Sequence, residues 1–132
     1  MIFIDSNIPM YLVGAEHPHK FDARRLLERS VALKTPLVTD AEVFQEILHR
    51  YVAINRPHAI RPAFDVLLAL VEEVYPVELV DVQRARDQVV GKRKLSARDA
   101  IHAAIMDRHG VKQIMSFDAA FDGIPGFVRV FE

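Results

Sequence analysis

Four acidic residues are spaced so that a folded chain could bring them into one site: Asp5, Glu46, Asp99 and Asp118. The first and last follow short apolar runs, whereas the middle two fall in the opening turns of amphipathic segments. Converging carboxylates repel one another, so such a cluster either takes up protons or holds a cation. Because the chain contains no cysteine, all-oxygen ligation would favour Mg²⁺ or Mn²⁺. A metal there would lower the pKa of a bound water and orient it for attack on phosphorus.

The first of these acids is positioned by an apolar run at residues 2–4, which shows no alternation with polar residues. That pattern is typical of a short strand buried on both faces of a parallel sheet. An aspartate at the carboxyl end of such a strand lies in the crevice above the sheet, where open α/β folds bind ligands. Asp5 could equally be a loop acid or a cap for the next element, and this pattern alone favours neither interpretation.

Strand and helix patterns alternate along the rest of the chain. Further strands are expected at residues 37–39, 77–80, 111–115 and 127–131, and helices at residues 7–13, 19–33, 40–55, 60–75, 82–90 and 97–109. Strands separated by helices imply right-handed crossovers. The expected architecture is therefore an α/β fold with a central parallel sheet and helices on both faces.

Two helix starts carry a capping-box pattern, in which a hydroxyl and an acid three residues later bind each other's backbone N–H groups. Thr39 and Glu42 form one such pair, so Glu42 has a structural role that Glu46, one turn further on, lacks. Ser96 and Asp99 form the other pair, and on this pattern alone Asp99 is more simply explained as structural. A functional role for Asp99 is favoured by its expected position at the same edge of the sheet as the other acids.

Length and composition limit the class of protein. With 132 residues, 51% of them hydrophobic, the chain is expected to form a single domain over residues 1–132 that buries about two thirds of its unfolded surface. The formal net charge of −1 excludes a globally basic nucleic-acid binder but leaves room for local charged patches. There is no secretory signal pattern, and the apolar runs are far shorter than the ~20 residues of a membrane helix. We expect a soluble, cytoplasmic protein without membrane contact.

Four segments, in order, resemble the four motifs of the PIN-domain ribonucleases: Asp5-Ser6-Asn7, the helix start from Thr39 to Glu46, Leu95 to Ala104, and Ser116-Phe117-Asp118 onward to Gly126. They are most similar to those of the single-domain VapC-type toxins of toxin–antitoxin pairs, and the resemblance covers nearly the whole chain. It implies a PIN-like three-layer fold with the first strand central in the sheet. It also implies Mg²⁺- or Mn²⁺-dependent endonucleolytic cleavage of RNA, and an antitoxin that blocks the site by binding beside it.

Carried over residue by residue, the resemblance implies that Asp5, Glu46, Asp99 and Asp118 are catalytic and ligate the metal directly or through water. Ser116 would position a water or an acid, and Asn7 would line the site. Asp122 and Glu42, each four residues from one of the acids, are further candidates for the lining of the site.

A basic cluster precedes and follows the start of the third motif: Lys92, Arg93, Lys94 and Arg98. These side chains could hold RNA phosphates beside the acids. The alternative is a solvated cluster favourably placed near a helix C-terminus. His102, one turn beyond Asp99, is more consistent with a core or supporting position than with a ligand. A wide apolar stripe on the helices of residues 40–75 also predicts a homodimer.

Other functions fit the residues less well. A PIN-like module that binds RNA or protein without cutting would gain nothing from four mutually repelling acids. Phosphoryl transfer through an aspartyl intermediate at Asp5 usually needs a second acid close by, which Ser6 and Asn7 do not supply. Nucleotide binding is also not supported, because the chain has neither a Gly-x-Gly-x-x-Gly nor a Walker pattern.

Overall fold

The structure is a computed structural model that describes residues 1–91 and 94–132, so the predicted phosphate contacts Lys92 and Arg93 lie outside the described residues. Within the described residues, five strands form one parallel sheet: β1 (Ile2–Ile4), β2 (Leu37–Asp40), β3 (Glu73–Tyr75), β4 (Gln113–Met115) and β5 (Val128–Val130). The strand order is β3-β2-β1-β4-β5, which puts β1 at the centre as expected.

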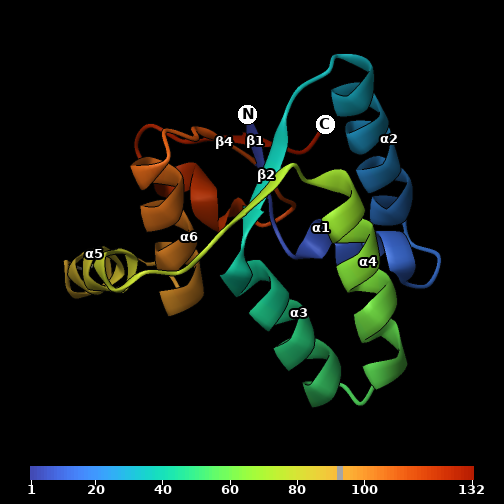
Figure 1. The fold of residues 1–132 in the computed structure, drawn as a ribbon, viewed down its shortest axis with the longest axis horizontal. Helices are drawn as coiled ribbons and strands as arrows, with labels where there is room; N and C mark the ends of the chain where they lie inside the picture. Colours follow the sequence, from blue (N-terminus) through green and yellow to red (C-terminus); the bar gives the residue numbers. More distant parts are fainter. Residues whose placement is uncertain (92–93) are drawn as a thin grey trace.

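Helices cover both faces of this sheet (Figure 1). They are α1 (Asn7–Val13), α2 (Pro18–Ala32), α3 (Ala41–Ala53), α4 (Ile60–Leu70), α5 (Leu79–Val90) and α6 (Ala97–Arg108), with short 3₁₀ turns η1 (Pro57–Ala59) and η2 (Ala119–Gly123). The helices α1, α2 and α4 lie on one side of the strands and α5 and α6 on the other, while α3 projects from the end of β2. The predicted three-layer α/β fold is confirmed. None of the helices in the described ranges is long and apolar enough to cross a membrane.

The central strand is buried because its three residues are all apolar and it has a hydrogen-bonded neighbour on each side. Phe3 is fully buried and pairs with Val38 of β2 and with Ile114 of β4. At the carboxyl end, Ile4 pairs with Met115, so the residues that follow these two strands emerge at the same level. The chain therefore places Asp5 and Ser116 side by side at one edge of the sheet.

Two elements predicted between residues 60 and 82 were wrong. The helix expected at 60–75 ends at Leu70, and the strand lies at residues 73–75 rather than 77–80. Among the described residues, this strand pairs only with β2 at the edge of the sheet and is partly exposed. Its short run of residues therefore carries little of the apolar pattern of an inner strand. The apolar spacing of α4 continued through Val71 and Val74, which concealed the boundary.

The following helix was predicted to begin at residue 82. It begins at Leu79 instead, because Glu78 is its N-cap. Asp81, the residue before the predicted start, lies in the first turn and accepts the backbone N–H of Glu78 at 2.9 Å. Its buried carboxylate also accepts two 2.8 Å hydrogen bonds from Arg108 of α6. The arginine holds the pKa of Asp81 below its usual range, so this ion pair fastens α5 to α6.

The N-cap of α3 was also predicted wrongly. Asp40, rather than Thr39, caps the helix, and its Oδ1 accepts the N–H of Val43 at 2.8 Å. The hydroxyl of Thr39 instead donates to the backbone carbonyl of Ile4 at 2.9 Å, which ties β2 to β1. Successive residues of a strand point to opposite faces, so only one of Thr39 and Asp40 could reach the start of the helix. Of the other predicted capping box, the Ser96 half is confirmed, since its hydroxyl accepts the N–H of Asp99 at 3.1 Å.

The packing of α2 against the sheet gives a stability prediction. Leu26 is 1% exposed, whereas Leu33 at the end of the same helix is 70% exposed. Leu26→Ala should lower the free energy of unfolding by about 2–5 kcal/mol because it leaves a cavity in the core. Leu33→Ala should change it by less than about 0.5 kcal/mol. Urea unfolding followed by circular dichroism measures both values, and similar losses in the two variants would contradict the assigned burial.

Candidate active site

Asp5 is the most enclosed of the four predicted acids, with only 3% of its surface exposed at the end of β1. Its Oδ1 accepts the backbone N–H of Ser6 at 2.8 Å. Its Oδ2 accepts the hydroxyl of Ser116 at 2.6 Å and the amide Nδ2 of Asn7 at 3.3 Å. Three donors from the two adjacent strand ends therefore fix the orientation of this carboxylate.

The side chains of Asn7 and Ser116 connect the first and fourth motifs. Asn7 donates to the Ser116 hydroxyl at 3.1 Å and accepts the backbone N–H of Phe117 at 3.3 Å. The same hydroxyl accepts the backbone N–H of Asp118 at 3.0 Å. Both residues thus lie beside Asp5, and the loop after β4 is held against the loop after β1.

Burial raises the pKa of Asp5 from 3.8 to about 6, although the charge of His102 and the hydrogen bond from Ser116 oppose this rise. The carboxylate of Glu46 adds to it by like-charge repulsion. Asp5 is therefore ionised at neutral pH only at a cost, which a cation beside it would remove.

Glu46, in α3, is held by two partners. Its Oε2 accepts the hydroxyl of Ser6 at 2.8 Å, and its Oε1 is bound by the Nε2 of His102. On the far side of the ring, the Nδ1 of His102 contacts Oδ2 of Asp40 at 2.7 Å. A continuous chain of polar contacts therefore runs from Asp40 through His102 and Glu46 to Ser6.

His102 is completely buried in α6. Burial by itself lowers the pKa of the imidazole, but Asp40 and Glu46 on its two sides outweigh this and raise the pKa well above 6.5. The charged ring then donates from both nitrogens, and its hydrogen bond to Glu46 together with its charge holds the pKa of Glu46 below its usual value against the effect of burial. His102 thus occupies the supporting position that the sequence favoured.

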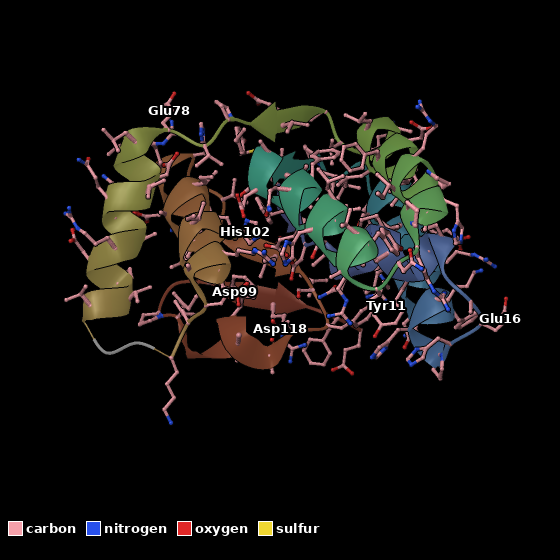
Figure 2. The ribbon with its side chains drawn as sticks, turned by 90° about the horizontal axis from the view of Figure 1, so that it is seen from below. Tyr11, Glu16, Glu78, Asp99, His102 and Asp118 are labelled. Carbon is pink, nitrogen blue, oxygen red and sulfur yellow. The ribbon has the colours of Figure 1, made fainter. Side chains whose placement is uncertain are left out.

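Asp99 and Asp118 form the more open side of the site. Asp99 lies in the first turn of α6, and burial, with the nearby charges of Asp118 and Glu46, raises its pKa above the usual value. Asp118 is exposed and caps η2, because its Oδ1 accepts the N–H of Ala120 at 2.9 Å. Figure 2 shows Asp99, His102 and Asp118 near one another in the middle of the molecule. Glu46 raises the pKa of both Asp5 and Asp99, and Asp118 raises that of Asp99, so each of the four acids is coupled by charge to at least one other.

The remaining predicted site residues have different surroundings. The carboxylate of Asp122 accepts hydrogen bonds of 2.8 and 3.0 Å from Arg129, so this acid already has a cationic partner. Arg98 lies 3.8 Å from Glu42, whose pKa is raised by burial and by the neighbouring acids. Lys94 is exposed just before α6.

Sequence reasoning missed two residues of the site. Asp40 was assigned to no role, although it is an acid at the carboxyl end of a strand, the same signal that identified Asp5. Ser6 was considered only as a residue that supplies no second acid, whereas its hydroxyl holds Glu46. That contact joins residues 40 positions apart, so no local sequence pattern could reveal it.

The donor set is suited to a hard divalent cation. Oxygens of Asp5 and Glu46 lie within 4.8 Å of each other and of a ring nitrogen of His102. That ring nitrogen carries a proton donated to Glu46, which leaves carboxylate oxygens as the available ligands. Among the described residues, one side-chain oxygen of Asp118 accepts a hydrogen bond and the other accepts none. Oxygens of this kind match the preference of Mg²⁺ and Mn²⁺.

The family model described as the PIN domain matches residues 2–126. The chain belongs to the PIN-domain family. The matched range includes all four acids and every strand of the sheet up to β4.

Two curated PIN-domain relatives are similar over most of their length. The chain is 58% identical over 130 residues to ribonuclease VapC13 of Mycobacterium tuberculosis, which covers 98% of this chain and 99% of that protein. It is 42% identical over 118 residues to ribonuclease VapC23 of the same species, covering 89% and 93% of the two chains.

Solved structures show the same fold. The crystal structure of Mycobacterium tuberculosis VapC20, described as a sarcin-ricin loop cleaving toxin, superposes with a TM-score of 0.80 at 26% identity and covers 98% of each chain. A toxin–antitoxin complex from Klebsiella pneumoniae matches with a TM-score of 0.68 at 19% identity, covering 97% of this chain and 96% of that one. The second likeness supports the PIN fold alone.

The raised pKa of Asp5 predicts that Asp5→Asn stabilises the metal-free protein. The folded pKa of about 6 lies above the unfolded value of 3.8, so the cost of ionising Asp5 is absent below pH 3.8 and complete above about pH 6. In a chelating buffer, the variant should gain up to about 3 kcal/mol at pH 7.5 and about half of that at pH 5.

Urea unfolding at the two pH values measures this gain. Asp65→Asn, which removes an exposed acid on α4, is the matched control and should change little at either pH. Equal stability of Asp5→Asn and the wild type at both pH values would contradict the burial cost assigned to Asp5.

Proposed function

We propose that this PIN-domain protein is an Mg²⁺- or Mn²⁺-dependent endoribonuclease that acts as the toxin of a type II toxin–antitoxin pair in the cytoplasm. The observation that carries the proposal is the approach of Asp5 and Glu46 oxygens to within 4.8 Å, with Asp99 and Asp118 coupled to this pair by charge and with burial and mutual repulsion raising the pKa of Asp5 and Asp99. The names of the relatives support the substrate, since VapC13 and VapC23 are both called ribonucleases.

In this proposal the four acids hold the cation directly or through water, and each residue around them has a stated task. A bound Mg²⁺ or Mn²⁺ would supply an activated water and offset charge on the leaving oxygen of the phosphodiester. Ser116 and Asn7 orient Asp5 through their hydrogen bonds. Ser6 and His102 orient Glu46, so that both inner carboxylates are fixed before substrate arrives. Asp118, the exposed acid, is accessible to the RNA side of the site.

The substrate's phosphates would be held by basic residues around the start of α6. Arg98 and Lys94 are the described members of this group, and Lys92 and Arg93 complete it in our proposal. Arg98 faces Glu42 at 3.8 Å, a weak, partly exposed pair in which a phosphate could replace Glu42. Such contacts position RNA without reading its sequence.

The main prediction concerns Asp99→Asn, which removes one negative ligand but preserves the size of the side chain and the cap from Ser96. Cleavage of a mixed RNA pool with Mn²⁺ should fall by at least about 100-fold, because the metal loses one ligand and the acidic cluster loses one negative charge. Cut fragments are quantified by gel or by sequencing of the new ends, beside a chelator control that should abolish cleavage by the wild type.

The matched control is Asp107→Asn on the same helix. Asp107 is exposed and lies 3.5 Å from Arg84 on the surface, so this variant should retain full activity. Unchanged cleavage by Asp99→Asn would overturn the proposed chemistry. Folded wild-type protein that neither cuts RNA nor binds Mn²⁺ by calorimetry would favour the alternative, a PIN-like module that binds RNA or protein without cutting.

We also propose that the protein pairs with a cognate antitoxin and forms a homodimer. Apolar side chains of α3 and α4 are left in solvent, with Val52 63%, Leu68 54% and Leu48 46% exposed. Surface of this kind is typical of an interface between chains.

Light scattering should therefore give about twice the 15.0 kDa mass of the chain. Val52→Lys should shift the mass toward that of one chain, because a charge cannot be buried without a partner. A monomer mass for the wild type at high protein concentration would contradict the dimer.

A further inference from the structure

Arg129, on the edge strand β5, binds both ends of the segment that carries Asp118, here called the Asp118 loop (residues 116–122). Its Nε and Nη2 donate to the two carboxylate oxygens of Asp122 at 2.8 and 3.0 Å. Its Nη1 donates to the backbone carbonyl of Ser116 at 3.3 Å. Ser116 and Asp122 lie on either side of Asp118 in the sequence. One guanidinium group therefore joins the two ends of the loop that presents the fourth acid.

The position of Arg129 is set by β5 and by its last residues. Arg129 pairs with Ile114 of β4, and the next residue, Val130, accepts the backbone N–H of Ser116 at 3.2 Å. The guanidinium carbon lies 3.9 Å from the centre of the Phe131 ring, and only 11% of the Arg129 side chain is exposed. A cation over an aromatic face is attracted by the ring. The arginine is therefore held on the sheet and can hold the loop in turn.

The contact between Arg129 and Asp122 fixes direction as well as distance. The planar guanidinium group matches a carboxylate through two parallel hydrogen bonds, which a single point charge cannot reproduce. Arg129 lowers the pKa of Asp122, chiefly through these hydrogen bonds. They also raise the pKa of Arg129, and the charge of Asp118 adds to that rise, so Arg129 is electrostatically coupled to the fourth acid.

Asp118 needs support from outside its loop because its own hydrogen bonds are local. Its Oδ1 accepts the N–H of Ala120 at 2.9 Å, and its backbone N–H donates to the hydroxyl of Ser116 at 3.0 Å. Both contacts join residues two positions apart, so they shape the turn without attaching its far end to the sheet. Phe121, 1% exposed, anchors the apolar side of the loop in the core. Arg129 anchors the polar side, on which Asp118 lies exposed.

We propose that Arg129 is a positioning residue for the divalent cation: by joining the ends of the Asp118 loop, it holds Asp118 where this acid can share a metal ion with the other three. The inference rests on the metal-dependent nuclease proposed above and adds a residue to its machinery. A ligand that is ordered in advance does not have to be ordered when the metal binds. Loss of the Arg129 contacts should therefore weaken metal binding more than the chemistry that follows it.

The first measurement detects the positioning effect without metal. Amide hydrogen exchange is followed by NMR in a chelating buffer at the backbone N–H groups of Asp118 and Ala120, which are both hydrogen-bonded within the loop. In Arg129→Gln, exchange at these two amides should accelerate about 10-fold because the loop opens more often. The amide of Glu78 is bound in the same way by Asp81 at 2.9 Å, at the start of α5, and should exchange at the wild-type rate.

The second measurement is Mn²⁺ binding by calorimetry, together with the Mn²⁺ dependence of RNA cleavage. Arg129→Gln should weaken Mn²⁺ binding about 10-fold and raise the Mn²⁺ concentration for half-maximal cleavage equally, while the rate at saturating Mn²⁺ stays within about 2-fold. A variant that is merely less stable would not show this split. Leu26→Ala, which destabilises the buried face of α2, is the matched control and should bind Mn²⁺ like the wild type.

Two further variants test the geometry of the contact. Arg129→Lys keeps the positive charge but lacks the planar fork, so it should recover little of the lost Mn²⁺ affinity. Asp122→Asn changes a side chain that is 52% exposed, which protects the test against loss of folding, and it should also weaken Mn²⁺ binding. Adding Asp122→Asn to Arg129→Gln should weaken binding little further, because both substitutions remove the same contact.

The outcomes separate this inference from the nuclease function. Unchanged Mn²⁺ affinity in both Arg129→Gln and Asp122→Asn, unchanged loop exchange in Arg129→Gln, or full recovery in Arg129→Lys overturns the positioning role even if the wild type cuts RNA. Faster loop exchange with weaker Mn²⁺ binding supports it. If the wild type then binds Mn²⁺ but cuts no RNA, the nuclease proposal fails while the positioning role stands. A folded wild type that binds no Mn²⁺ overturns both.

Discussion

The architecture of the site depends on one constraint, the placement of a carboxylate at the end of a strand that is itself completely buried. Ile4 is inaccessible to solvent, and Asp5, the next residue, is only 3% exposed. Raising the pKa from 3.8 to about 6 corresponds to roughly 3 kcal/mol at neutral pH, a large share of the stability of a small domain. A protein that only needed to fold would gain by an amide at this position. The cost is understandable if the negative charge itself is required.

The surroundings of Asp5 limit that cost without removing the charge. Ser6 and Ser116 donate hydrogen bonds to it, and the charged ring of His102 acts at longer range. His102 is in turn compensated by Asp40 and Glu46, so a buried cation lies among three inner carboxylates. Removing either partner of such a buried pair leaves an uncompensated charge, which is why the arrangement must be treated as one unit. The register of β1 with β2 and β4 brings these groups together.

How much of this could be predicted from sequence follows from how local each signal is. The apolar run of β1 is continuous, and the acid after it is visible directly, so the central strand and Asp5 could be predicted. The strand at 73–75 could not, because an exposed edge strand does not need two apolar faces and its apolar residues also fit a helix. The cap at Asp40 was missed because the Thr-x-x-Glu pattern offered a plausible alternative one residue earlier, and only the alternation within β2 decides between them.

The site shows the same division between local and long-range information. The four acids were predicted from their positions after strands or at helix starts, which topology alone brings to one edge. The partners that orient them come from contacts between distant residues, such as Ser6 with Glu46 and Asn7 with Ser116. The ring contacts of Phe117 with Tyr11 and His19 are of the same kind, because they form only after the first and fourth motifs have been joined at the sheet edge. The hydrogen bonds of Asn7 and Ser116 thus orient Asp5 and also hold the loop after β4 against the loop after β1.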